Sequence, residues 1–172
     1  RLGEAVRLQL SDVDPEQLCF LVRQSKGKTR IVPFLDDLAR ELSDCLLLRR
    51  RILEATAAVD PGTLLLRNTG QALPVTAASD AICRLLRREG LKPAKGRTGP
   101  RPYEFRHAFA VHRLTAWYHE GVDIHARLPW LSAYMGHVDV LGTQVYLRAT
   151  PELMDLASQR FARHWYHSGK TS

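Results

Sequence analysis

The chain has little cysteine, no long apolar run and no excess of acidic residues, and each absence excludes a class of protein. Its three cysteines, Cys19, Cys45 and Cys83, are odd in number and lie far apart beside apolar residues. We therefore expect reduced, mostly buried thiols and no zinc site. No run reaches the length of a membrane span and no charged-then-apolar leader opens the chain, so we expect a soluble, cytoplasmic protein.

Positive charge is what the chain has in excess. Lys and Arg number 25 against 18 Asp and Glu, a formal net charge of +7 in 172 residues. Because the excess is spread along the chain, an extended polyanion is a better partner than a small acidic ligand. An apolar content of 45% predicts a globular core, and without repeats or a break in composition we interpret residues 1–172 as one domain.

Apolar spacing in the first half predicts a short helix, a hairpin and a long helix. Pro15 and its polar neighbours end the first helical pattern. Two β-prone runs flank Gly27, which predicts an antiparallel hairpin with Lys26 at its tip. The expected elements are helices at 1–10 and 35–58, strands at 18–23 and 29–34, and a candidate third strand at 64–66.

The second half is expected to be helical apart from one loop. Residues 92–102 are rich in proline, glycine and cations and contain no core residues. The expected helices are at 75–89, 103–120, 124–136, 140–147 and 151–165. Together the two halves predict an α+β fold that is mostly helical, with a small antiparallel sheet.

A histidine and a tyrosine near the end of the chain suggest chemistry on a phosphodiester. His137 follows Gly136, and Tyr146 lies nine positions later. A tyrosine hydroxyl is a weak nucleophile unless cations hold an electrophile against it. Each of these residues, taken alone, also has a structural alternative. Tyr146 could be a core aromatic, His137 a cation at a helix C-terminus, and Arg106 a buried arginine satisfied by carbonyls.

Taken together, these segments resemble the catalytic domain of the tyrosine recombinase (phage integrase) family. The matching segments are Arg1-Leu2-Gly3-Glu4 for the first arginine box, Gln24-Ser25-Lys26-Gly27-Lys28 for the hairpin lysine, Phe105-Arg106-His107 for the second arginine box, Met135-Gly136-His137, and Thr143-Gln144-Val145-Tyr146 for the nucleophile. Lys26 fits the hairpin lysine better than Lys28. Tyr103 stands where the family usually has a histidine.

The resemblance implies a site-specific DNA recombinase or integrase that cleaves and rejoins strands through a 3′-phosphotyrosine intermediate. Arg1 and Arg106 would hold phosphate oxygens as bidentate forks. Lys26 would protonate the leaving 5′ oxygen, His137 would donate a hydrogen bond to the phosphate, and Tyr146 would attack. We expect no metal and no cofactor.

Tyr103 is a departure from the family pattern. A phenol can donate a hydrogen bond to a phosphate oxygen, but with an ordinary pKa near 10 it is a poor base at neutral pH. Tyr103 is therefore expected to position the phosphate and not to act as a base. His107 and His112 are interpreted as structural or DNA-facing residues.

DNA contacts outside the active site are expected from cations, mostly in the loop at 92–102. The candidates are Lys28, Arg88, Lys92, Lys95, Arg97 and Arg101. A disordered surface loop is the open alternative to DNA contact. The resemblance also implies double-stranded DNA as partner, a homotetramer on DNA with a monomer left open in isolation, no membrane and no small-molecule substrate.

Several readings remain open at this level. A type IB topoisomerase shares the fold and nucleophile, and a catalytically silent DNA-binding module is a second alternative. The stretch 117–128 is similar to transposon and genomic-island integrases. The last helix carries an apolar face, from Leu153 to Trp165, that could pack on its own chain or on a neighbouring protomer. Because the first residue is Arg1 and not Met, we expect a fragment without the family's N-terminal core-binding domain.

Overall fold

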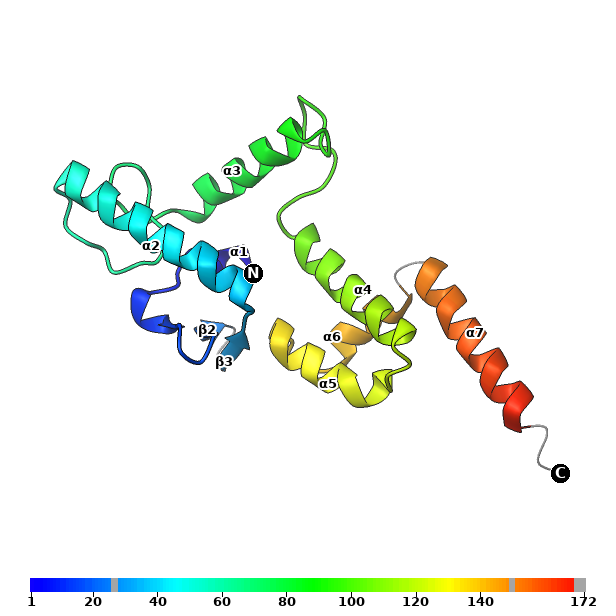
Figure 1. The fold of residues 1–172 in the computed structure, drawn as a ribbon. Helices are drawn as coiled ribbons and strands as arrows, with labels where there is room; N and C mark the ends of the chain where they lie inside the picture. The colour runs from blue at the N-terminus through cyan, green and yellow to red at the C-terminus, as the bar shows by residue number, and fades with distance from the viewer. Residues whose placement is uncertain (26–27, 149–150, 169–172) are drawn as a thin grey trace. The chain divides into compact units, whose positions relative to one another are not determined.

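The chain divides into two compact units. The structure is a computed structural model that describes residues 1–25, 28–148 and 151–168. Unit 1 is Arg1–Tyr103 and unit 2 is Glu104–Ser172. The interpretation of residues 1–172 as one catalytic domain stays a prediction. Figure 1 labels the helices α1–α7 and the strands β2 and β3 of the two units.

Unit 1 contains a three-stranded antiparallel sheet. Its strands are β1 (Val13–Asp14), β2 (Cys19–Ser25) and β3 (Lys28–Pro33), in the order β1-β2-β3. The predicted hairpin is confirmed: Phe20 pairs with Val32, and Ser25 pairs with Lys28. Lys26, expected at its tip, lies outside the described residues. The candidate strand at 64–66 is not part of the sheet, because Leu66 forms only an isolated bridge with Ala72.

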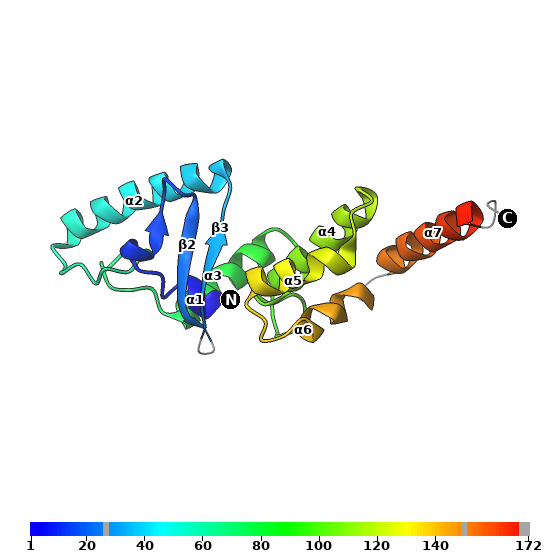
Figure 2. The same cartoon turned by 90° about the horizontal axis from the view of Figure 1, so that it is seen from below.

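The helices of unit 1 support this sheet. They are α1 (Leu2–Ala5), the 3-10 turn η1 (Leu10–Asp12), α2 (Asp36–Thr56) and α3 (Val75–Arg88). Helix α2 runs across one face of the sheet (Figure 2) and ends at Ala57, which adopts the left-handed conformation. Its buried Arg49 bonds to the Thr63 carbonyl at 2.9 Å and to the Asp60 carboxylate. The long helix was predicted almost to the residue, whereas the expected helix at 1–10 is reduced to α1 and η1.

The three cysteines of unit 1 are thiols. Cys19, Cys45 and Cys83 are free and half-buried, so they are more exposed than the mostly buried thiols that the sequence predicted. Burial raises the pKa of the Cys45 thiol, although the charge of Arg49 acts in the opposite direction. A raised pKa leaves less thiolate at neutral pH, so Cys45 is a poor nucleophile.

Unit 2 is entirely helical in its described part. Its elements are α4 (Glu104–His119), α5 (Ile124–Met135), α6 (Leu141–Gln144), the 3-10 turn η2 (Val145–Arg148) and α7 (Pro151–Ser168). Asp123 caps α5 by accepting the His125 N–H at 2.9 Å. Four helices were predicted here, and the expected helix at 140–147 is divided between α6 and η2. The protein therefore has the predicted α+β fold, mostly helical with a small antiparallel sheet.

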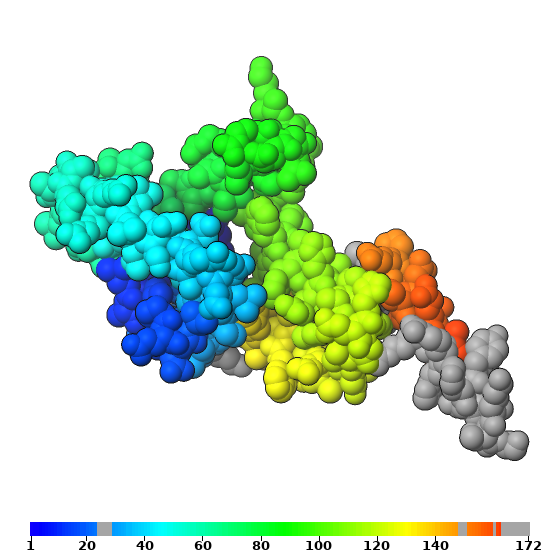
Figure 3. All heavy atoms as spheres, in the orientation of Figure 1, coloured from blue at the N-terminus to red at the C-terminus, as the bar shows by residue number. Residues whose placement is uncertain are grey.

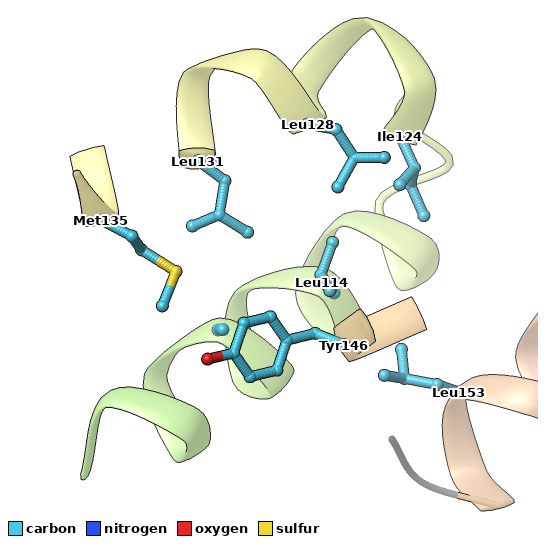
Figure 4. Packing of buried hydrophobic residues seen from close by; sticks show 8 residues of the cluster. Leu114, Ile124, Leu128, Leu131, Met135, Tyr146 and Leu153 are labelled. Carbon is cyan, nitrogen blue, oxygen red and sulfur yellow. The ribbon is translucent and has the colours of Figure 1, made fainter. Parts of the chain in front are cut away.

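One hydrophobic core holds unit 2 together. Leu114 of α4, Leu128 of α5 and Leu153 of α7 are at most 2% exposed, and they surround the ring of Tyr146 together with Leu131 (Figure 4). Since Leu153 packs into this core, the start of α7 is anchored within its own chain. Further along α7, Phe161 is 67% exposed, so the apolar face of this helix is only partly covered.

Candidate active site

Arg106 is fixed in unit 2 by a peptide carbonyl. It lies in the first turn of α4, is half-buried, and its Nη2 donates to the backbone oxygen of Met135 at 2.5 Å. Met135 is the last residue of α5, where helix carbonyls have no partner inside the helix and a nearby cation is favoured. The carbonyl is neutral, so it orients the guanidinium without cancelling its charge.

The end of α5 also sets the position of His137. Gly136 ends the helix at φ +67°, in the left-handed region that glycine occupies without strain. The next residue is His137, whose backbone N–H bonds to the Ser132 carbonyl at 3.0 Å. One short turn therefore joins the carbonyl that holds Arg106 to the histidine that follows it.

Thr143 holds the imidazole of His137. The Thr143 hydroxyl lies 2.7 Å from His137 Nδ1, and Thr143 is fully buried. Gly142 lies against the same ring, since a Cβ at that position would be 3.4 Å from His137 Cγ. Contact at Nδ1 orients the ring and sets the other nitrogen, Nε2, as its second hydrogen-bonding group. Sequence reasoning quoted Thr143 only as part of a motif and did not anticipate this role.

Tyr146 lies beside two histidines but inside the core. Its ring centroid is 6.3 Å from that of His137, nearly parallel to it, and 5.3 Å from that of His107. The residue is 4% exposed, and its hydroxyl lies on the side of the ring away from Leu153 (Figure 4). Tyr146 is thus both a core aromatic, as its structural alternative held, and a neighbour of the expected catalytic histidine.

Arg1 is anchored in unit 1 by a buried carboxylate. Its Nη1 donates to Glu4 Oε1 at 2.7 Å, and Nη2 of Arg30, on β3, donates to Glu4 Oε2 at 2.6 Å. The Glu4 side chain is 7% exposed. Two guanidinium groups thus share one carboxylate, and the amino group of Arg1 also donates to Glu4 Oε2 at 3.1 Å. The spacing of Arg1 and Glu4 could have suggested their pairing, but Arg30 is 26 positions from Glu4 and carried no sequence signal.

A second buried carboxylate lies close by in unit 1. Burial disfavours the charge on Asp12, but the hydrogen bonds from Arg23 Nε and the Gln9 backbone N–H, with the Arg23 charge, outweigh it and lower the pKa of Asp12. Asp12 therefore stays ionised at neutral pH. Ionic contacts fix this part of unit 1, as they fix Arg1.

Three further expected site residues are Lys26, Lys28 and Tyr103. Lys26 lies outside the described residues, and Lys28 begins β3 with a side chain that is also outside the described part. Tyr103 is 54% exposed and directly precedes α4. Unit 2 brings Arg106, His137 and Tyr146 together, whereas Arg1 belongs to unit 1, and the roles of all these residues stay predictions.

The expected DNA-contacting cations do not form one uniform group. Lys92 is only 6% exposed, and its Nζ donates to carbonyl oxygens of its own loop. Lys92 was expected to be a surface cation that contacts DNA, but its ammonium group points into the loop. Lys95, Arg97 and Arg101 are exposed. Arg88 is also exposed and pairs with Glu89 at 2.8 Å.

Metal-binding clusters and membrane-spanning helices are two features that the described part of the chain does not show. Among residues 1–25, 28–148 and 151–168, no group of three or more His, Cys, Asp or Glu residues could hold a metal ion. Within the same ranges no helix has the length and apolar character needed to cross a membrane.

Comparison with known proteins finds a family model and curated relatives that match this chain. The model of the phage integrase family matches residues 1–152. A protein of Sinorhizobium fredii, y4rB, whose name describes an integrase/recombinase, is 40% identical over 166 residues. The match covers 96% of this chain and 52% of that protein, so the chain spans about half the length of this curated relative.

Solved structures share the fold. The crystal structure of XerA recombinase matches with a TM-score of 0.68 and 24% identity, covering all of this chain and 54% of that one. A post-cleavage complex of XerH site-specific recombinase with its palindromic difH substrate matches with a TM-score of 0.68 and 20% identity, covering 94% of this chain and 42% of that one.

Proposed function

Because this chain belongs to the phage integrase family, we propose that it is the catalytic part of a site-specific DNA recombinase or integrase. It would cleave and rejoin DNA strands through a covalent 3′-phosphotyrosine intermediate. The observation that carries the proposal is the grouping of Arg106, His137 and Tyr146 around the end of α5 and the η2 turn. The name of the Sinorhizobium relative supports it.

Tyr146 is the attacking group. Its hydroxyl oxygen forms a bond to the phosphorus of a phosphodiester while the bond from phosphorus to the 5′ oxygen breaks, so the DNA keeps its 3′ phosphate as a tyrosyl ester. The phenolic proton leaves as the ester forms, and the departing 5′ oxygen gains a proton. At 4% exposure, Tyr146 must have its hydroxyl uncovered when DNA binds.

Charge on the non-bridging oxygens is met by fixed cations and donors. Arg106 would contribute its guanidinium charge, which suits bidentate contact with phosphate oxygens, while the Met135 carbonyl orients it. His137, oriented through Nδ1 by Thr143, would donate a hydrogen bond from Nε2. Groups fixed in advance stabilise a developing charge without reorganising during the reaction, which is the largest contribution in many enzymes.

The proposal requires residues of unit 1 at the same phosphate. Arg1 would be the second guanidinium that holds the phosphate. It is held by Glu4, whose negative charge Arg30 also contacts. Lys26 would protonate the 5′ oxygen, since an amine can lose its proton and regain it. Tyr103 would position the phosphate without acting as a base, so Tyr103→His is expected to cleave at an equal or faster rate, and a large loss would contradict this role.

Double-stranded DNA is the proposed substrate, and a homotetramer on DNA is the proposed assembly. The XerH structure is described as bound to its difH substrate, and that statement applies to XerH. The basic composition of this chain supports the same partner here. A place among transposon or genomic-island integrases, with cytoplasmic action, belongs to the same proposal.

The decisive experiment traps the covalent intermediate. A nicked suicide substrate, which loses the strand that would reverse the reaction, should give a protein–DNA adduct that survives denaturing gel electrophoresis. Tyr146→Phe should abolish the adduct. The matched control is Tyr134→Phe, which removes the same hydroxyl from a tyrosine of unit 2 that stacks on Phe109, and it should leave adduct formation intact.

The other outcomes separate the rival functions. If no adduct forms with any substrate, the chain is a silent DNA-binding module. If supercoiled plasmid without a target site is relaxed efficiently and Tyr146→Phe stops this, the activity is that of a type IB topoisomerase. If the adduct persists in Tyr146→Phe and disappears in Tyr134→Phe, Tyr146 is not the nucleophile and the proposed assignment is wrong.

A further inference from the structure

The loop after α3 contains a lysine that faces inward. Lys92 Nζ donates to the carbonyl oxygens of Thr98, Gly99 and Pro100, at 2.7, 3.3 and 3.2 Å. An ammonium group has three donors, and here each has an acceptor. Burying a charge is unfavourable unless it is hydrogen-bonded in this way. Lys92 therefore ties the start of the loop to its end.

A second cation holds the middle of the same loop. Arg87, in the last turn of α3, donates from Nε to the Pro93 carbonyl at 3.3 Å and from Nη2 to the Gly96 carbonyl at 3.4 Å. The loop is also closely packed at Gly99, where φ is +83° and a Cβ would lie 3.1 Å from Pro93 Cδ and 3.3 Å from Lys92 Cγ. A Pro/Gly-rich segment is thus held in one conformation by its own carbonyls.

Between this loop and α3 lies a cationic pocket of about 310 Å³. Its lining residues are Ser79, Cys83, Arg87, Lys92, Gly96, Arg97, Arg101 and Pro102. Half of them are cations, and none of these eight, all in the described stretch 79–102, is a carboxylate. Like charges around one pocket repel each other, and a bound anion relieves that repulsion. Part of this green segment projects from the surface (Figure 3).

We infer that this pocket binds a phosphate of the DNA backbone away from the reacting phosphodiester, and that Lys92 is its positioning residue. The inference rests on the proposed function for its choice of DNA as the source of the phosphate. Arg97 and Arg101 make the contacts, Arg87 supports them from α3, and Lys92 makes no contact with DNA. A loop that is ordered before binding loses less conformational entropy when the complex forms.

The salt dependence of DNA binding separates a supporting lysine from a contacting one. Each phosphate contact adds about 0.9 to the slope of log affinity against log salt concentration. Lys95→Met removes one exposed charge and should lower the slope by at most about 0.9. Lys92→Met also removes one charge, but it releases the loop that carries Arg97 and Arg101. It should therefore lower the slope by about 1.8, the value for two phosphate contacts. An equal or smaller effect than that of Lys95→Met would overturn the inference.

A second pair of variants changes the loop without changing its charge. Gly99→Ala places a methyl group against Pro93 and Lys92, whereas Gly96→Ala shares the positive φ, at +91°, but meets nothing within 4 Å. Gly99→Ala should lower the salt slope more than Gly96→Ala does, although neither removes a cation. Equal slopes for the two glycine variants would contradict a loop whose packing sets the pocket.

The measurements use fluorescence anisotropy with duplex DNA and the Tyr146→Phe protein, so that binding is read without cleavage. Covalent trapping in the otherwise unsubstituted protein is measured separately. If the variants change the salt slope as predicted but no adduct forms, the pocket is supported and the proposed reaction is rejected. If an adduct forms but the variants leave the salt slope unaltered, the reaction is supported and the pocket is rejected. Inorganic phosphate is the other arm: if it binds the pocket and Arg97→Ala weakens that binding but leaves DNA affinity unchanged, the assignment to the DNA backbone is wrong. A protein without affinity for DNA would overturn it as well.

Discussion

Units 1 and 2 hold their expected catalytic side chains with different kinds of partner. In unit 1, Arg1 is held by the ionised Glu4, which Arg30 also binds. In unit 2, Arg106 is held by a peptide carbonyl and His137 by a hydroxyl. A neutral anchor orients a cation and leaves its charge intact, whereas a carboxylate cancels the charge unless a second cation restores it. Arg30 is the second guanidinium at Glu4 in unit 1, whereas the anchors described for Arg106 and His137 in unit 2 are uncharged groups.

The largest effect is expected from the neutral anchor of unit 2. Arg106→Ala should lower the single-turnover cleavage rate by about 10²–10³, the usual loss when one fixed donor to a developing charge is removed. Arg106→Lys should lose nearly as much, because one ammonium cannot both reach the Met135 carbonyl and present a fork to phosphate. Arg113→Ala, an exposed arginine of the same helix, is the control. A lysine variant with nearly full activity would mean that charge alone suffices.

The ionic anchor of unit 1 allows a sharper test, because its charges can be changed in compensating pairs. Arg30→Gln removes one of the two guanidinium groups that share Glu4, so Glu4 should offset more of the charge on Arg1, and cleavage should slow about tenfold, the rate equivalent of ~1.4 kcal/mol. Adding Glu4→Gln removes the surplus negative charge, so the double variant should be faster than Arg30→Gln. Arg51→Gln, an exposed residue of α2, controls for net charge. A double variant slower than both single variants would show that Arg30 only holds the structure of the sheet.

A smaller loss is expected from the hydroxyl anchor of His137. Thr143→Val keeps the shape of the side chain but removes its hydrogen bond to Nδ1, which is worth about 0.5–1.5 kcal/mol. Cleavage should slow about threefold to tenfold. Thr143→Ser retains the hydroxyl and should restore most of the rate. If the valine and serine variants behave alike, the hydroxyl does not orient His137.

The elements of the fold were accessible from sequence because apolar periodicity records which face of a segment is buried. Helix α2 and the β2–β3 hairpin were predicted close to their observed bounds. Strand β1 was missed, since two residues are too few to show an alternation. The helix expected at 140–147 becomes α6 and η2, and periodicity does not distinguish an α turn from a 3-10 turn there.

The site divides in the same way between local and tertiary information. Arg106, His137 and Tyr146 could be proposed from sequence because local motifs mark them. Their anchors were not found: the Met135 carbonyl has no residue-type signal, and Arg30 meets Glu4 only through the fold. Lys92 shows the limit most clearly. A lysine in a Pro/Gly loop is normally solvated, and only the three carbonyls that converge on its ammonium reveal otherwise.

The smallest expected effect concerns acid, and it separates the ionic contacts of unit 1 from unit 2. Asp12 and Asp60, whose pKa values lie below the usual range, both belong to unit 1. A carboxyl group with a lowered folded-state pKa contributes stability that is complete above its unfolded pKa, about 3.8 here, and is lost as the pH falls through the folded value. Unit 1 should therefore loosen first as the pH drops below about 4.

The tryptophans make this difference measurable, because Trp117, Trp130 and Trp165 all belong to unit 2. In an acid titration, hydrogen exchange in the β2–β3 hairpin should accelerate before tryptophan fluorescence changes. Asp12→Asn should destabilise unit 1 by about 1 kcal/mol at neutral pH, a modest value because its partner Arg23 is 55% exposed and screened by solvent. The same variant should reduce the acid sensitivity of the hairpin and leave the fluorescence transition in place. If fluorescence and hairpin exchange change at the same pH in both proteins, the two units unfold together, and ionic contacts in unit 1 then stabilise the site of unit 2 as well.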